Sequence, residues 1–160
     1  MPLYDRIVFH GSVVAVDGVG YLFTAKSGTG KSTHTRLWRE MLGDRAVMVN
    51  DDKPMIKLTD TGAVVYGTPY NGKHHLGNNI RVPLKAICIL ERGEHNSITT
   101  VNKSEAYPML LQQVYRPTDR AAFAMTLTLI DKFAEKTALY KLNANMDPQA
   151  AEVAYNAMKG

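Results

Sequence analysis

The run Ser27-Gly28-Thr29-Gly30-Lys31-Ser32 constrains this chain more than any other feature. It stands between an apolar segment, residues 21–24, and residues 31–42, where apolar side chains recur at helical spacing. A glycine-rich turn exposes backbone N–H groups to phosphate, and the N-terminus of the following helix adds positive potential. In such a loop the lysine contacts the terminal phosphates of a nucleotide, and the next hydroxyl ligates Mg²⁺. The sequence therefore predicts a strand, a phosphate-binding loop and a helix.

Ala25 stands where the usual phosphate-loop pattern begins with glycine, five places before the second glycine. A chance glycine turn before a helix is the alternative, but the strand–turn–helix context favours the phosphate loop. We therefore expect ATP and Mg²⁺ as ligands, with Ser32 ligating the metal. The residues expected to contact the nucleotide are Ser27, Gly28, Thr29, Gly30, Lys31, Ser32 and Thr33.

The remaining pattern predicts strands first and helices later. Asp17-Gly18 between two apolar runs is typical of a β-hairpin, since glycine adopts positive φ without steric cost. Short apolar runs predict strands at residues 6–9, 12–16, 21–24, 45–49, 55–58, 63–66 and 82–90, with a loop at 67–81. The expected helices cover residues 31–42, 103–115, 119–136 and a final segment from residue 148. We expect residues 1–160 to form a single α/β domain, mixed α+β in arrangement, with a mixed sheet and C-terminal helices.

Two aspartates, Asp51 and Asp52, end the predicted strand at residues 45–49. Adjacent side chains at a strand end point in opposite directions, so one carboxylate can hold Mg²⁺ while the other accepts a proton from a hydroxyl nucleophile. A solvated acidic turn is the alternative. The phosphate loop about twenty residues upstream favours the functional interpretation.

Other chemistry-bearing side chains give weaker signals. His10 precedes Gly11 at the start of a hairpin strand, a position that alone favours packing over catalysis. His34 follows the phosphate loop on its helix and is expected to be exposed. Cys88, the one cysteine, lies in an apolar run and is interpreted as a small buried hydrophobe. The adjacent pair His74-His75 has no evident third metal ligand and is assigned to a loop.

Charge and composition exclude several classes of function. The net charge of +4 suits an anionic ligand such as a nucleotide. No basic run interleaves with aromatic residues, so we expect no nucleic-acid partner. No apolar stretch is long enough to span a bilayer and the N-terminus lacks a signal-peptide pattern, so we expect no membrane association and a cytoplasmic location.

The stretch from His10 to Asp52 resembles the catalytic domain of the HPr kinase/phosphorylase family, and its loop and acidic pair also resemble phosphoenolpyruvate carboxykinase, which shares the fold. The matching motifs are His10-Gly11, Asp17-Gly18-Val19-Gly20, the phosphate loop and Asp51-Asp52, in the family's order. The resemblance implies that Lys31 contacts the β and γ phosphates, Ser32 ligates Mg²⁺ and Asp51 lies beside the metal. It also implies that Asp52 is the catalytic base and that His10 lies near the transferred phosphate.

The expected function is an ATP- and Mg²⁺-dependent kinase acting on a hydroxyl of a peptide, a protein or a small molecule, with Asp52, Lys31 and His10 as catalytic residues. A degenerate nucleotide-binding module that acts as a sensor or docking protein is the alternative, because no acid occurs between Asp60 and Glu91 to replace the family's metal-binding glutamate. A carboxykinase-like enzyme is a third possibility, for which no set of acid-binding residues is found. The family's tendency to assemble makes a homo-oligomer plausible.

Overall fold

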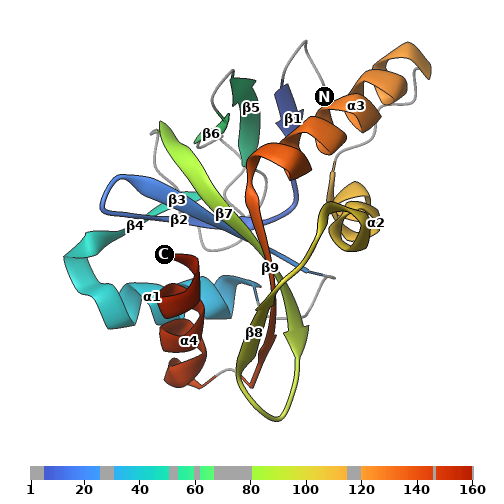
Figure 1. Ribbon diagram of the computed structural model, residues 1–160. Coiled ribbons are helices and arrows are strands. Elements are labelled where there is room, and N and C mark those ends of the chain that lie inside the picture. The colour runs from blue at the N-terminus through green and yellow to red at the C-terminus, as the bar shows by residue number, and fades with distance from the viewer. Residues whose placement is uncertain are drawn as a thin grey trace.

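The computed structural model describes residues 6–25, 31–50, 54–59, 62–66, 81–114, 120–145 and 147–159. Within these ranges a mixed β-sheet carries helices on both faces (Figure 1). The strands are β1 (Arg6–Val8), β2 (Ser12–Val16), β3 (Val19–Thr24), β4 (Ala46–Asn50), β5 (Met55–Thr59), β6 (Gly62–Tyr66), β7 (Arg81–Arg92), β8 (Ser97–Thr100) and β9 (Ala138–Ala144). The helices are α1 (Lys31–Leu42), α2 (Lys103–Gln113), α3 (Arg120–Lys136) and α4 (Pro148–Met158), with a 3-10 turn at Gly43–Arg45. The predicted mixed α/β class is confirmed.

The long strand β7 holds the sheet together. The strand order is β1-β5-β6-β7-β3-β2-β4, and β9 pairs with β7 and with β8. The first residues of β7 pair antiparallel with β6, whereas its later residues pair parallel with both β3 and β9. Strand β7 thereby joins the antiparallel strands β1-β5-β6 to the antiparallel strands β3-β2-β4.

Side chains alternate between two cores, one on each face of the sheet. On β3, Leu22 belongs to the core covered by α2 and α3, while Tyr21 and Phe23 belong to the core covered by α1 and α4. This alternation follows from the two-residue period of a strand. In Figure 1 α1 and α4 lie side by side below the sheet, and α2 and α3 lie on the other side of it.

An aromatic cluster fixes α1 to the sheet and to α4. The ring of Trp38 is fully buried and its centroid lies 5.0 Å from Tyr21, 5.1 Å from Phe23 and 5.5 Å from Tyr155. Aromatic pairs at these distances add to the stability gained by burying their surface. Cys88 is buried in the same core, as predicted, and burial raises the pKa of its thiol.

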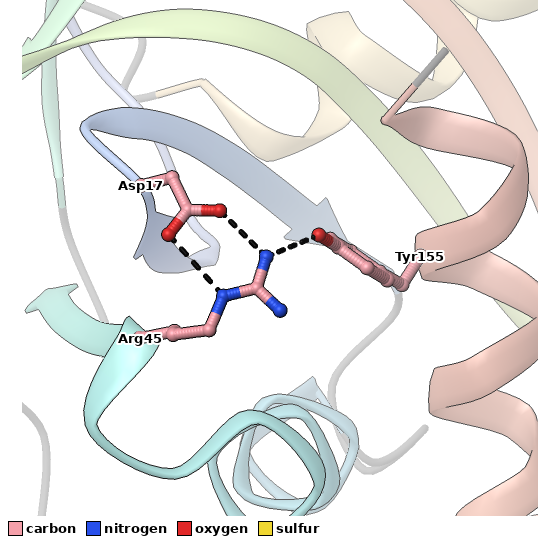
Figure 2. A network of polar contacts seen from close by, with 3 residues as sticks. All are labelled: Asp17, Arg45 and Tyr155. Atoms are coloured by element: carbon pink, nitrogen blue, oxygen red, sulfur yellow. Dashed lines mark hydrogen bonds and ion pairs between the residues drawn. The ribbon is translucent and has the colours of Figure 1, made fainter.

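An exposed polar network ties three elements together at the turn between β2 and β3 (Figure 2). Arg45, just before β4, donates from Nη2 to Asp17 at 2.6 Å and to the hydroxyl of Tyr155 on α4 at 2.8 Å. Its Nε donates to the other oxygen of Asp17 at 3.3 Å. The bidentate contact with Arg45 lowers the pKa of the Asp17 carboxyl. The network fixes the turn end of the hairpin to α4.

The expectation that only helices follow the early strands is wrong. Residues 97–100 and 138–144 form β8 and β9, which pair antiparallel with each other. Helical spacing within residues 119–136 predicts a core face of Phe123, Leu127, Ile130 and Phe133, and the core face of α3 differs from this in part. Ile130 and Phe133 are buried as expected, but Phe123 and Leu127 are only half-buried, and Leu129 and Ala134 are buried in their place.

No helix within the described ranges has the length and apolarity required to cross a membrane.

Candidate nucleotide-binding site

Strands β3 and β4 both reach the same end of the sheet, and β2 starts there between them. Ser12 pairs with Phe23 of β3, and Val13 pairs with Asn50 of β4. Because neighbouring strands lie about 4.8 Å apart, the ends of β3 and β4 are separated by about 10 Å. We call this the loop end of the sheet, defined by Ser12, Thr24 and Asn50. The residues predicted to bind phosphate leave β3 here, and the predicted acidic pair leaves β4 here.

Lys31 is the first residue of α1 and lies at the loop end. Its side chain is partly buried, and its Nζ donates a hydrogen bond to the carbonyl of Ala25 at 3.1 Å. This bond joins the two residues that flank residues 26–30. The first turn of α1 contains no acidic residue, so no carboxylate there offsets the positive end of the helix dipole. The Lys31 ammonium group and the N-terminus of α1 together suit an anion such as a nucleoside triphosphate.

Buried hydroxyls anchor the first turn of α1 to the sheet. Ser12 at the start of β2 and Thr35 on α1 are both fully buried, and their hydroxyl oxygens lie 2.9 Å apart. The Thr35 hydroxyl also lies 3.3 Å from the carbonyl of Lys31, to which it donates. The position of Lys31 is therefore set by side chains beneath the helix.

His10 lies at the loop end, on the side of the sheet that carries α2. Its carbonyl accepts a hydrogen bond from the Thr24 hydroxyl at 2.9 Å, and its backbone N–H donates to the carbonyl of Gln113 at 2.6 Å. The backbone of His10 is thus held between the end of β3 and the end of α2. The next residue, Gly11, is buried, and a Cβ there would lie 2.6 Å from Leu22 Cδ1 and 2.9 Å from the carbonyl oxygen of Phe23. Glycine at this position allows the chain to approach β3.

His34 contradicts the expectation of an exposed side chain. It is fully buried, and its Nε2 accepts a hydrogen bond from Trp38 Nε1 at 3.0 Å. Its ring also contacts Phe23 edge-on, with a centroid separation of 4.7 Å. Burial lowers its pKa to about 4, so the ring is neutral at physiological pH. His34 supports α1 one turn after Lys31.

The structure brings two of the three expected catalytic residues, His10 and Lys31, to the loop end. Thr33 lies partly buried on the first turn of α1, where the backbone of Ser32 also lies. The other expected site residues lie outside the described residues: Ser27, Gly28, Thr29, Gly30, Asp51 and Asp52, together with the hydroxyl of Ser32.

Sequence reasoning missed the residues that hold the site in place. Thr24, Thr35 and Gln113 each make one of the anchoring hydrogen bonds described above. Thr24 and Thr35 flank the glycine-rich loop, and a hydroxyl in a buried segment is a signal that a partner is needed. Gln113 acts through its backbone carbonyl, for which the sequence gives no signal.

Comparisons with known proteins agree with this geometry at the level of the fold. The family model described as SynChlorMet cassette protein ScmC matches residues 2–146. No curated protein matches the chain. A similar solved structure is that of the Hpr(Ser) kinase/phosphatase from Coxiella burnetii, which covers 96% of this chain and 99% of its own with a TM-score of 0.50. The two sequences are 11% identical, so this likeness concerns the fold alone.

Proposed function

The chain belongs to the SynChlorMet cassette protein ScmC family, and from that premise we propose that it is a kinase. It would use ATP and Mg²⁺ and transfer the γ-phosphoryl group to a hydroxyl of a peptide, a protein or a small molecule. The shared fold with a kinase/phosphatase supports a nucleotide-related function. The residues at the loop end supply the chemical argument.

The proposal rests on the observation that β3 and β4 end at the same end of the sheet. Asp51 and Asp52 follow Asn50, the last residue of β4, directly in the sequence. Lys31 donates to the carbonyl of Ala25, which follows β3, and β3 lies across β2 from the end of β4 at Asn50. The span between the ends of β3 and β4, about 10 Å, is of the size that a triphosphate and an attacking hydroxyl require.

Each residue of the proposed site has a distinct role. Lys31 and the N–H groups of the loop neutralise the charge that develops on the β and γ phosphates during transfer. Asp52 orients the acceptor hydroxyl and takes its proton, while His10 lies on the acceptor side of the γ-phosphate. Ser32 and Asp51 are the oxygen donors suited to Mg²⁺, which when bound would contribute charge neutralisation on the phosphates.

The proposed role of Asp52 is tested by the substitution Asp52→Asn. We expect transfer from radiolabelled ATP to a serine-centred pentapeptide library to fall by about 10²–10⁴-fold, because general base catalysis contributes on that scale. Binding of nucleotide should persist. Asp44→Asn, an exposed aspartate of the 3-10 turn, is the matched control and should leave transfer unchanged. Undiminished transfer in Asp52→Asn would remove Asp52 from the mechanism.

A nucleotide-binding module without transfer activity is the second candidate. It is favoured by the sequence between Asp60 and Glu91, which contains no acid to provide a second carboxylate ligand for Mg²⁺. The two candidates differ in one measurement. Tight binding of ATP, with neither hydrolysis nor transfer to any peptide, protein or small-molecule hydroxyl tested, would support the module and contradict the kinase.

A further inference from the structure

A small cavity lies next to the loop end, on the sheet face covered by α2. Its apolar lining consists of Ile89 of β7, Val101 just before α2, and Ala106 and Met109 of α2. Three charged side chains lie at its mouth: Glu91 of β7, Glu105 of α2 and Lys141 of β9. Its volume is about 100 Å³. Since a cavity of about 150 Å³ holds a benzene molecule, this one has room for a group of roughly four heavy atoms.

Strand register places this cavity beside the proposed reaction site. Ile89 pairs with Thr24, which is separated from the predicted phosphate loop in the sequence by Ala25 and Lys26 alone. Thr24 in turn donates to the carbonyl of His10, and α2 runs from the cavity to Gln113, which accepts from the N–H of His10. The cavity and His10 therefore lie along the same helix, on the face of the sheet opposite α1.

The charges at the mouth favour a cation. Lys141 Nζ lies 3.2 Å from Glu91 Oε1, which pairs one carboxylate with the one ammonium among the described lining residues. Within the part of the chain that the structure describes, Glu105 forms no ion pair, and its side chain is exposed. Two carboxylates against one ammonium leave an excess negative charge above an apolar floor. A short alkyl chain that ends in an ammonium group matches both properties.

We infer that this cavity binds an alkylammonium group of the phosphoryl acceptor, an inference that rests on the proposed kinase function. The acceptor then carries a hydroxyl and a primary amine separated by roughly 5–10 Å, one to two strand spacings. A lysine side chain near a phosphorylated serine and a free amino alcohol both have this chemistry. Glu105 is the residue that determines the preference for a cation.

Binding to the cavity is tested without any reaction, by titrating the ¹⁵N-labelled protein with propylammonium chloride and with n-propanol. We expect shifts of the Ile89, Ala106 and Lys141 amide signals, with propylammonium binding about fivefold more tightly than the neutral alcohol, as for a partly exposed ion pair. Glu105→Gln should remove that difference. Glu152→Gln, an exposed glutamate in the separate hollow between α1 and α4, should retain it. Equal affinity for both probes, or no shifts up to about 50 mM, would overturn the inference.

Transfer assays identify the source of the amine. The probes are a pentapeptide with lysine two residues before serine, its norleucine counterpart and aminopentanol. A KM about fivefold lower for the lysine peptide than for the norleucine peptide supports a peptide acceptor, and transfer to aminopentanol alone supports a small one. Equal KM values, or no transfer to any amine-bearing probe with nucleotide binding intact, contradict the inference and leave the kinase proposal standing. Loss of nucleotide binding contradicts the kinase proposal instead, whatever propylammonium does.

Discussion

Among single residues near the loop end, His34 is the most tightly constrained. Its Nε2 accepts from Trp38, so the neutral ring carries its proton on Nδ1. Nδ1 is buried and has no hydrogen-bond partner in the described structure. A second proton on this ring would place a charge in an apolar core at the positive end of α1. The protein therefore holds His34 neutral, which couples folding to pH.

Stability should fall as the pH is lowered from about 6.5 to about 4. In this window His34 takes up a proton in the unfolded chain and stays neutral in the folded protein, where its pKa is about 4. Proton uptake by the unfolded state lowers the free energy of unfolding, by about 2 kcal/mol between pH 7.5 and pH 5. Urea unfolding of the protein and of His34→Leu at both pH values checks this. The difference in pH dependence between the unmodified protein and His34→Leu gives the contribution of His34. An identical pH dependence would show that His34 is not the group responsible.

Gly11 tests whether the close approach at the loop end is needed. Gly11→Ala places a methyl group 2.6 Å from Leu22 Cδ1 and 2.9 Å from a backbone carbonyl, so we expect a loss of roughly 1–3 kcal/mol in the free energy of unfolding. Gly62→Ala is the control, since a Cβ at Gly62 meets nothing within 4 Å. Chemical denaturation measures both. If Gly11→Ala is as stable as Gly62→Ala, the backbone at residue 11 is not held against β3 as described.

At the scale of elements, the sequence predicts those whose signals are local. Helix α1 begins and ends where expected, because the glycine loop precedes it and Leu37 and Trp38 give it a buried face. Strand β9 was not predicted, because residues 138–144 alternate weakly and owe their strand conformation to pairing with β7 and β8. Phe123 lies near the exposed start of α3, and the half-buried Leu127 follows the buried Thr126. Helical period alone therefore tells neither which end of a long helix meets the core nor which side chains face it.

In the candidate site, too, the residues with local sequence signals were predicted and those brought together by distant elements were not. His10 and Lys31 were predicted from short motifs, and the structure brings them to one end of the sheet. The cavity under α2 was not predicted, because Glu91, Glu105 and Lys141 come from three elements and form no motif. Such a cavity depends on the parallel pairing of β7 with β9, which joins segments about fifty residues apart.

The aromatic contact between α1, the sheet and α4 should contribute measurably to the free energy of unfolding. Trp38→Ala removes a fully buried ring that touches Tyr21, Phe23 and Tyr155, and should lower the free energy of unfolding by about 3–5 kcal/mol. Met41→Ala, on the same helix, removes a side chain that is 38% exposed and should cost less than about 1 kcal/mol. Denaturant titration compares the two. Equal losses would contradict the described packing of α1.

In the whole molecule, the proposed function would place its two reaction partners on the two faces of the sheet. Helix α1 begins at the loop end on one face, where Lys31 would contact the nucleotide, while α2 reaches His10 and the cavity on the other. The long strand β7 keeps these parts in register, because β3 and β9 both pair with it in parallel. The acceptor and the nucleotide would therefore meet over the ends of β3 and β4.

Calorimetric titration with a non-hydrolysable ATP analogue and Mg²⁺ tests whether the loop end binds nucleotide. We expect saturable binding at one site, weakened at least about tenfold in Lys31→Ala because a charged contact to phosphate is lost. Lys132→Ala, an exposed lysine on α3, should bind as the unmodified protein does. No heat of binding for the unmodified protein, or the same dissociation constant in Lys31→Ala, would contradict a nucleotide site at Lys31.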